Sequence, residues 1–405
     1  WTHLPSPVNS RSRVCIAAPG VPWDHPDLRA LREGGVEVIG EIEWVARHLP
    51  NPMIGVTGTA GKGTVTLWTQ AMLHAAGIDA AAGGNLDPAL ATLALEAPGP
   101  ERWFVVEMSS FALERSPTFR PRVAVVTRLG RDHLDRHGDL ATYHATKRKL
   151  LANLGPRDVA VLNADDPAQA AWLDTPASVR SYAASGRPDA YARIDGETLW
   201  LGDEAASRLT HFAPRGRHQR ENLLAAATAA AAAGAPAAAI EAAIPTLQVA
   251  PGRHEVISTR CHVTFVDDSI ATRELAVAAA LEASLPPVAW IVGGQDKGAD
   301  PDAVRREVEG RVDLIIGIGE AGGAFARAFT DLAETQVLAD ADGTTAMRRA
   351  VRVAADHRYR TGGGTVLLAP LAASFDQFAG YADRGRAFRT AVTELLEEDP
   401  WTACS

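Results

Sequence analysis

The sequence predicts an α/β protein with parallel sheets, divided into three domains, and two observations carry this prediction. Short apolar runs alternate with segments of helical composition along most of the 405 residues. Such nearly continuous apolar runs indicate strands that are buried on both faces, as they are in parallel sheets covered by helices. One of these runs leads into a glycine-rich loop, Gly55–Val65, that contains a lysine. The length allows two or three domains, each with a core of its own.

Composition and charge restrict the classes of function. The chain is 46% hydrophobic and 22% charged, as is usual for globular proteins. Its net charge of −9, with no basic stripe to offset it, argues against a general nucleic-acid binder. The three cysteines lie far apart without metal-ligand spacing, which fits a reducing cytoplasm. The uncharged run Leu223–Ile240 is mostly alanine and is interrupted by Gly234 and Pro236, so it predicts a buried helix rather than a membrane span. We expect a cytoplasmic monomer that binds neither nucleic acid nor membranes.

Residues 1–48 are expected to form a first, truncated domain. After an irregular start, the pattern predicts a strand within Arg13–Gly20, a helix over Asp27–Glu33, a strand over Val36–Ile39 and a helix over Glu41–His48. This is the back half of a larger βαβ domain. The first residue is Trp1 rather than Met and no signal peptide follows, so we expect the sequence to be a piece of a longer chain.

The glycine-rich loop is the first candidate site. A strand, a glycine-rich turn, Lys62 and a helix form the arrangement that cradles phosphates, because backbone N–H groups, the helix N-terminus and the lysine all attract anions. The helix is expected over Val65–Ala76. The match to the usual spacing is incomplete. Val56 stands where a glycine is usual, and Gly63 stands where a Mg²⁺-binding hydroxyl is usual, with Thr64 one residue late.

A second domain is expected over residues 49–250. Its strands are predicted at Met53–Val56, Trp103–Val106, Val123–Val126 and Val159–Leu162. Polar residues follow these strands, at the edge where parallel α/β sheets bind ligands. Glu107 follows the second strand, and two roles are open for it: its carboxylate could hold Mg²⁺, or it could place a negative charge at the N-terminus of a helix. His133 follows the third, and a histidine taken alone is more often structural.

A third domain is expected over residues 251–405. Strands are predicted at His262–Val266, Val288–Val292, Val312–Ile318 and Thr365–Leu368, with helical segments between them. Polar stretches again follow the strands, at Asp267–Ser269, Gly293–Lys297 and Ala369–Ser374. This pattern predicts a second doubly wound sheet with a polar edge of its own.

Taken in order, these polar stretches resemble the motifs of the Mur ligase family, MurD type. The resemblance extends from about Ala17 to Phe388 and rests on Pro19–Pro22, Thr57–Lys62, Gly83–Asn85, Glu107–Glu114, Asp132–Gly138, Tyr143 with Lys147, Gly216–His218 with Asn222, Arg253, Asp268–Thr272, Gly293–Lys297, Ser374–Phe378 and Arg384–Gly385. The stretches Ser109–Glu114, Asp132–His137 and Ser374–Phe378 are the most typical of the D-glutamate-adding type.

The resemblance implies a fold and a reaction. The fold has an N-terminal Rossmann-like domain for a uridine nucleotide, a central P-loop ATPase domain and a C-terminal Rossmann-like domain for the amino acid. The implied reaction joins UDP-N-acetylmuramoyl-L-alanine to D-glutamate in peptidoglycan precursor synthesis, with ATP and Mg²⁺ as cofactors. ATP phosphorylates the alanyl carboxylate, and the amine of D-glutamate then displaces phosphate from the acyl phosphate.

The resemblance also implies roles for individual residues. The catalytic set is Lys62, Glu107, His133 and Lys147. The ATP-binding set is Gly58, Thr59, Gly61, Lys62, Gly63, Thr64, Asn222, Arg253 and Asp268. The substrate-binding set is Asn85, Ser109, Lys297, Ser374 and Tyr381. The Mg²⁺ set is Glu107, His133, Lys147 if it is carbamylated, and Thr64 in place of the hydroxyl that Gly63 lacks. These residue types suit phosphoryl transfer, which depends on positioning and on neutralising charge.

Departures from the family pattern leave two other functions open. Ala60, Gly63, Ala112, Ile270 and the stretch Arg128–Gly130 replace residues that are usual in the family. A relative that binds nucleotide without catalysis is one alternative, and the degenerate loop favours it. A ligase like folylpolyglutamate synthase is the other.

The loss of a lysine at Ile270 predicts a compensating residue. D-Glutamate brings two carboxylates, and a carboxylate left without a cation is costly to desolvate. Arg273 would share a side with Ile270 if the helix expected over Arg273–Ala283 began by Ile270. Arginine can also bind a carboxylate with two hydrogen bonds. We therefore predict that Arg273 contacts the second carboxylate of the substrate; the alternative is that it faces solvent.

Overall fold

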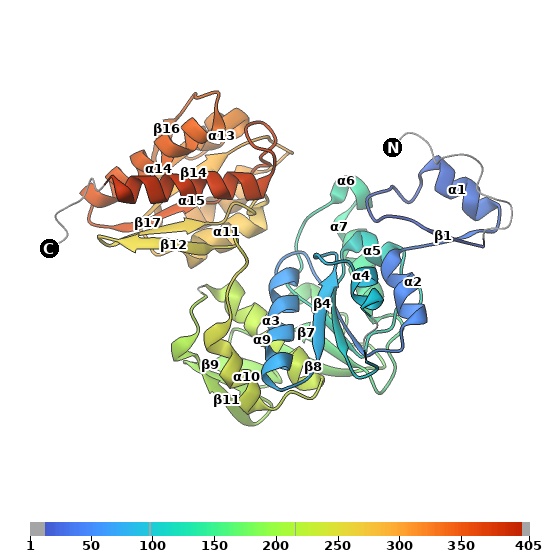
Figure 1. The fold of residues 1–405 in the computed structure, drawn as a ribbon. Helices are drawn as coiled ribbons and strands as arrows, with labels where there is room; N and C mark the ends of the chain where they lie inside the picture. The colour runs from blue at the N-terminus through green and yellow to red at the C-terminus, as the bar shows by residue number, and fades with distance from the viewer. Residues whose placement is uncertain (1–12, 97–98, 215, 399–405) are drawn as a thin grey trace. The chain divides into compact units, whose positions relative to one another are not determined.

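The computed structural model describes residues 13–96, 99–214 and 216–398, and the chain divides into two compact units (Figure 1). The first unit takes the chain up to Ala213 together with Gln219–Leu247. The second takes Pro214–His218 and the chain from Gln248. The first contains a two-stranded and a nine-stranded sheet, and the second a six-stranded sheet. This confirms the predicted α/β class, while the three predicted domain boundaries remain a prediction.

The N-terminal part of the first unit is a small βαβ unit. Strands β1 (Val14–Ile16) and β2 (Glu37–Ile39) pair in parallel, and α1 (Pro26–Glu33) connects them. The helix carries an acid in its first turn and a base in its last turn, which suits the helix dipole. Its apolar face packs on β2 in a core of four buried side chains, Ala17, Leu28, Leu31 and Val38. Helix α2 (Glu41–His48) then leads into the large sheet.

The large sheet contains the four strands that apolar runs predict. In chain order its strands are β3 (Met53–Thr57), β4 (Ala80–Gly84), β5 (Trp103–Glu107), β6 (Val123–Val126), β7 (Val159–Asn163), β8 (Ser178–Ala183), β9 (Ala192–Asp195), β10 (Thr198–Leu201) and β11 (Glu204–Arg208). Across the sheet the order is β11-β10-β9-β8-β7-β6-β3-β5-β4. The pairs from β4 to β9 are parallel, and β9, β10 and β11 are antiparallel. The carboxyl ends of β3, β5 and β6 therefore lie side by side.

Helices cover both faces of this sheet, with α3, α9 and α10 on one side in Figure 1 and α2, α4 and α5 on the other. The remaining helices of this part of the chain, after α1 and α2, are α3 (Lys62–Ala75), α4 (Leu90–Leu95), α5 (Ser110–Glu114), α6 (Leu134–His137), α7 (Leu140–Arg148), η1 (Lys149–Leu151), α8 (Pro167–Ala170), η2 (Leu209–His211), α9 (Arg217–Ala232), α10 (Ala237–Ala243) and η3 (Ile244–Thr246).

Two helix predictions need correction. Helix α3 begins at Lys62 rather than Val65, so Lys62, Gly63 and Thr64 form its first turn. The single buried helix predicted over Leu223–Ile240 is two helices, because Gly234 has φ +103° and Pro236 follows it before α10 begins. Within the described residues, no helix is long and apolar enough to cross a membrane.

The second unit contains the other four predicted strands. Its strands are β12 (Glu255–Arg260), β13 (Val263–Asp267), β14 (Val288–Gly293), β15 (Val312–Ile318), β16 (Glu334–Val337) and β17 (Gly364–Leu368), in the order β12-β13-β17-β14-β15-β16. All pairs are parallel except β12 with β13. Its helices are α11 (Glu274–Ala283), η4 (Pro301–Val304), α12 (Arg305–Val308), α13 (Gly319–Arg327), α14 (Gly343–Arg360) and α15 (Tyr381–Glu397).

Candidate functional site

The glycine-rich loop sits between β3 and α3, and its shape requires two of its glycines. Gly58 has φ +149° and Gly61 has φ +86°, values that side chains disfavour. A Cβ on Gly58 would collide with the side chain of Thr127, and one on Gly61 with that of Asn222. The loop is thus enclosed by the end of β6 and by α9. This placement brings Asn222, a predicted ATP-binding residue, against the loop.

The stretch that departs from the family motif supports the loop through its backbone. Thr59 N–H donates to the carbonyl of Arg128 at 2.9 Å, and Gly130 N–H donates to the hydroxyl oxygen of Thr59 at 3.0 Å. The Thr59 hydroxyl also lies 3.3 Å from the hydroxyl of Tyr143. Because main-chain groups make the first two bonds, the changed side chains at 128–130 do not remove them.

Two lysines converge on this loop. Lys62 Nζ donates to the carbonyls of Gly58 and Thr59, both at 3.1 Å. Lys147 Nζ donates to the carbonyl of Gly58 at 2.7 Å, and only 1% of Lys147 is exposed. Burial, and next the charge of Lys62, lower the pKa of Lys147 well below its usual value, while Asp132 and Glu107 oppose the shift. Lys147 is therefore not a surface cation, although Lys149, two residues further along the chain, is exposed.

Glu107 is the last residue of β5, next to the loop strand β3. Its carboxylate is 7% exposed and accepts a 2.7 Å hydrogen bond from the amide of Asn85 at the end of β4. Helix α5 begins three residues later at Ser110, with Ser109 as its N-cap through a 3.1 Å bond from Ala112 N–H. Glu107 thus lies outside the first turn of that helix, and the reading as a helix N-terminal charge is wrong.

His133 stands at the start of α6 in a left-handed conformation, with φ +50°. Its Nε2 lies 3.4 Å from the carboxylate of Asp132. Its ring lies 4.8 Å from that of Phe111 and 6.4 Å from that of Tyr143. The ring of Tyr143 in turn lies 4.4 Å from Lys147 Nζ. Tyr143 and Asp132 therefore connect predicted site residues; both lie in quoted motifs, and neither was assigned a role from the sequence.

Glu107 and His133 suit part of a Mg²⁺ site. Within the described residues, no group of three or more His, Cys, Asp or Glu side chains could hold a metal ion alone. Mg²⁺ usually binds proteins through one or two carboxylates and completes its shell with phosphates and water. A buried carboxylate beside the glycine-rich loop fits that donor set, and Thr64 lies in the first turn of α3 at 4% exposure.

The other predicted site residues lie in the second unit. Asp268 follows β13 and is 7% exposed; burial first, and the charge of Asp267 second, raise its pKa well above the usual value, against the opposing charge of Arg253. Ser374 is buried, and its carbonyl accepts bonds from Gln377 and Phe378 N–H. Lys297 is exposed, with Nζ 5.2 Å from the Phe375 ring centroid.

The argument that placed Arg273 beside Ile270 on one helix is wrong. Helix α11 begins at Glu274, so Ile270 precedes it and Arg273 is its N-cap. Arg273 is half-buried, and its role as a carboxylate contact remains a prediction without that geometric support. Tyr381 begins α15 and is 49% exposed.

Arg384 of α15 belongs to one of the matched motifs, but no role was predicted for it. It is 1% exposed and donates to the carbonyls of Ser269 and Ala372, both at 3.0 Å, and of Ala373 at 3.2 Å. Burial lowers its pKa to about 10. One guanidinium thus ties together the loops that follow β13 and β17, and it fixes the loop of Ser374.

The chain is similar to known proteins over most of its length. Residues 56–230 match the Mur ligase middle domain. The UDP-N-acetylmuramoylalanine–D-glutamate ligase of Thermus thermophilus is 46% identical over 397 residues, 96% of this chain and 86% of that protein. The ligase of that name from Deinococcus radiodurans is 42% identical over 403 residues, 97% of this chain and 83% of that protein.

Solved structures share the fold at low identity. A pseudomurein peptide ligase type C from Methanothermus fervidus has a TM-score of 0.64 at 17% identity, over 95% of this chain and 87% of that one. MurF ligase from Thermotoga maritima, in complex with ADP, has a TM-score of 0.63 at 16% identity, over 96% of this chain and 99% of that one. With relatives so similar over almost the whole length, the chain belongs to the Mur ligase family, as one of its UDP-N-acetylmuramoylalanine–D-glutamate ligases.

Proposed function

We propose that the chain uses ATP to join D-glutamate to UDP-N-acetylmuramoyl-L-alanine through an acyl phosphate, and that it works as a cytoplasmic monomer. The observation that carries the proposal is the group around Gly58, where Lys62 and Lys147 meet a phosphate-type loop beside the buried Glu107. The names of relatives up to 46% identical indicate the same reaction. Phosphoryl transfer needs positive charge positioned at the phosphates, and Lys62 would supply it together with Mg²⁺ beside Glu107.

Each residue of the first unit has a distinct part in this proposal. The backbone of Gly58–Gly63 and the start of α3 bind the phosphates of ATP, and Lys62 leaves its loop carbonyls to neutralise the γ-phosphate. Asn85 holds Glu107 in one orientation through its hydrogen bond, and it is proposed to bind the nucleotide-sugar substrate. Mg²⁺, held by Glu107, His133 and Thr64, supplies charge neutralisation at the phosphates when it is bound.

Lys147 is proposed to carry a carbamate. Its environment favours the neutral amine, which is the form that can add to CO₂. The nitrogen of the neutral amine bonds to the carbon of CO₂ and loses one proton, so an uncharged amine becomes an anionic carbamate. The carbamate would lie beside the proposed Mg²⁺ ligands, where its negative charge would help to hold the cation.

The second unit is proposed to bind the rest of the reactants. Arg253 and Asp268 contribute to ATP binding, as does Asn222 of the first unit. Lys297, Ser374, Tyr381 and Arg273 bind D-glutamate, whose two carboxylates need cations and hydrogen-bond donors. Arg384 acts through Ser374, by fixing its loop.

A phosphate-release assay tests the function and its alternatives. Purified protein with ATP, Mg²⁺ and UDP-N-acetylmuramoyl-L-alanine should release phosphate in a manner that depends on D-glutamate, and Lys62→Ala should abolish the release. Nucleotide binding without any turnover would favour the non-catalytic alternative. Release that depends on a folate and L-glutamate, but not on D-glutamate, would favour the folylpolyglutamate-synthase-like one.

A further inference from the structure

A cavity opens at the amino-terminal ends of the strands of the nine-stranded sheet, at the edge opposite the candidate site. Its volume is about 800 Å³, and the first residues of β3, β5, β6 and β7 line it: Met53, Trp103, Val123 and Val159. The glycine-rich loop and Glu107 lie at the carboxyl ends of the same strands. The cavity is therefore separate from the candidate site, and its size falls in the range of about 300–1,000 Å³ that is usual for small-molecule pockets.

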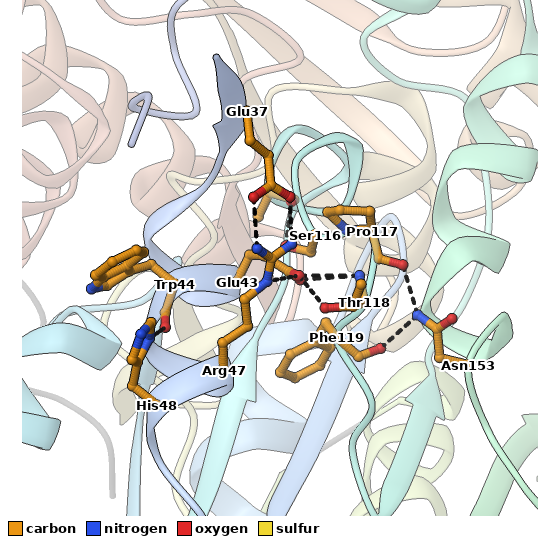
Figure 2. A network of polar contacts seen from close by, with 11 residues as sticks. Glu37, Glu43, Trp44, Arg47, His48, Ser116, Pro117, Thr118, Phe119 and Asn153 are labelled. Carbon is orange, nitrogen blue, oxygen red and sulfur yellow. Dashed lines mark hydrogen bonds and ion pairs between the residues drawn. The ribbon is translucent and has the colours of Figure 1, made fainter. Parts of the chain in front are cut away.

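A network of polar contacts fixes one wall of this cavity (Figure 2). Glu43 of α2 is fully buried; its carboxylate accepts from Arg47 Nε at 2.8 Å and from Thr118 N–H at 3.2 Å, and the Thr118 hydroxyl donates to it as well. The other two nitrogens of Arg47 donate to Glu37 at 2.9 and 2.8 Å. Glu43 is thus occupied by protein partners, and α2 is held in place against the sheet.

The rest of the cavity lining carries an excess of positive charge. Arg120, Arg122 and Arg157 all line the cavity. The first two share one buried carboxylate, Asp158, at 2.7 and 3.5 Å, and their side chains are 52% and 58% exposed. Arg157 is exposed, and among the described residues it has no hydrogen bond or ion pair. Three guanidinium groups thus have one carboxylate between them. The lining itself contains two acids, Glu43, which is occupied as described above, and Glu101, which is exposed.

We propose that this cavity binds a small organic oxyanion, with its phosphate or carboxylate head on these three arginines and its apolar body against the strand ends. Arginine forks match the oxygens of phosphate and carboxylate with paired hydrogen bonds. Leu49 and Trp103, which are both partly exposed, give the body an apolar surface. The net charge of the protein is −9, so a cavity lined by several arginines is a local exception to its acidic character. Such a local excess of positive charge attracts anions.

Calorimetry with three probes tests the proposal. The ATP site is first saturated with Mg²⁺ and a non-hydrolysable ATP analogue, and phenyl phosphate, benzoate and inorganic phosphate are then titrated in turn. We expect phenyl phosphate or benzoate to bind at one site per chain, and the double variant Arg122→Ala/Arg157→Ala to weaken that binding at least about tenfold. Which of the two binds more tightly tells whether the head is a phosphate or a carboxylate.

A matched variant and two opposing outcomes complete the test. Arg208→Ala removes an exposed arginine of the same unit at β11, and it should leave the probe affinity unchanged. Circular dichroism melting of all variants checks that each is folded. Equal affinity in the wild type and the double variant would overturn the site. Inorganic phosphate binding as tightly as phenyl phosphate would overturn the part played by the apolar wall.

Discussion

Nζ of Lys147 donates a 2.7 Å hydrogen bond to the carbonyl oxygen of Gly58, and so joins the end of α7 to the phosphate-type loop. Lys62 donates to the same oxygen at 3.1 Å. Two lysine amines thus donate to the same carbonyl oxygen in a buried environment, where a second positive charge raises the electrostatic free energy. The arrangement favours a neutral Lys147, and a phosphate group would give Lys62 a stronger acceptor than the loop carbonyls do.

Lys147→Met should remove activity while Lys149→Met should not. The two residues are only two positions apart in the sequence, but Lys147 is buried against Gly58 and Tyr143, whereas Lys149 is exposed. We expect turnover to fall about a hundredfold or more for the first variant, as for the loss of a positioned charged group. Steady-state phosphate release measures it. A Lys147→Met enzyme with normal turnover would exclude the residue from the site.

Carbamylation of Lys147 should be visible without any assay of turnover. Protein exposed to ¹³C-labelled bicarbonate should give a carbamate carbon signal in the NMR spectrum that is absent from Lys147→Met. Lys149→Met should retain the signal, because Lys149 is exposed, whereas Lys147 is buried against Gly58. A signal of equal size in all three proteins, or in none, would contradict the proposal.

Thr64→Val should weaken Mg²⁺ binding. The substitution keeps the volume in the first turn of α3 but removes the hydroxyl that is proposed to replace the one missing at Gly63. The Mg²⁺ concentration for half-maximal turnover should rise about tenfold or more. Thr66→Val is the matched control, since Thr66 is buried in the same helix and its hydroxyl has no partner within the described residues. If Thr66→Val raised the Mg²⁺ requirement as much as Thr64→Val, the effect would come from altered packing of α3 and not from the loss of a metal ligand.

Much of the fold was predictable because the parallel strands are continuous apolar runs. Strand β4 was missed because Ala80–Gly84 is all alanine and glycine, which have low strand propensity. The strands β8 to β11 were missed because they are only partly buried and contain polar residues, so none of them is a continuous apolar run. Their pairing with one another, rather than their own composition, makes them strands.

The sequence motifs predicted which residues belong to the candidate site, but they did not predict how these residues are arranged in space. The motif resemblance named Lys147, yet its burial depends on Gly58, far away in the chain. Arg384 joins loops after two different strands, and such a role depends on the sheet order β13-β17-β14. The position of Arg273 was mispredicted because helix α11 starts one residue after it, and helix boundaries are the least certain part of a sequence pattern.

Arg273→Ala should raise the KM for D-glutamate. If the guanidinium pairs with a substrate carboxylate, its loss should raise that KM at least about tenfold, equal to about 1.4 kcal/mol, with little change in the KM for ATP. Arg306→Ala is a suitable control because the Arg306 side chain is 92% exposed in the same unit. An unchanged KM for D-glutamate would leave Arg273 as a helix-capping residue that faces solvent.

His137 should make the stability of the protein fall with pH below neutrality. Its side chain is 2% exposed; Nε2 lies 3.0 Å from the hydroxyl of Ser110 and Nδ1 3.5 Å from the carboxylate of Glu114. Burial lowers the pKa of His137 below its usual value of 6.5, although Glu114 opposes the shift. The unfolded chain therefore takes up a proton near pH 6.5 that the folded chain still excludes, so the unfolded state gains stability as the pH falls through that value.

The free energy of unfolding, measured by urea titration from pH 7.5 to 5, should accordingly decrease toward low pH more steeply in the wild type than in His137→Gln. Glutamine can keep a hydrogen bond with Ser110 but does not titrate. His74→Gln, at an exposed position of α3, should follow the wild-type curve. Parallel curves for the wild type and His137→Gln would show that the proton is taken up equally in both states, and that burial of this imidazole does not resist its charge.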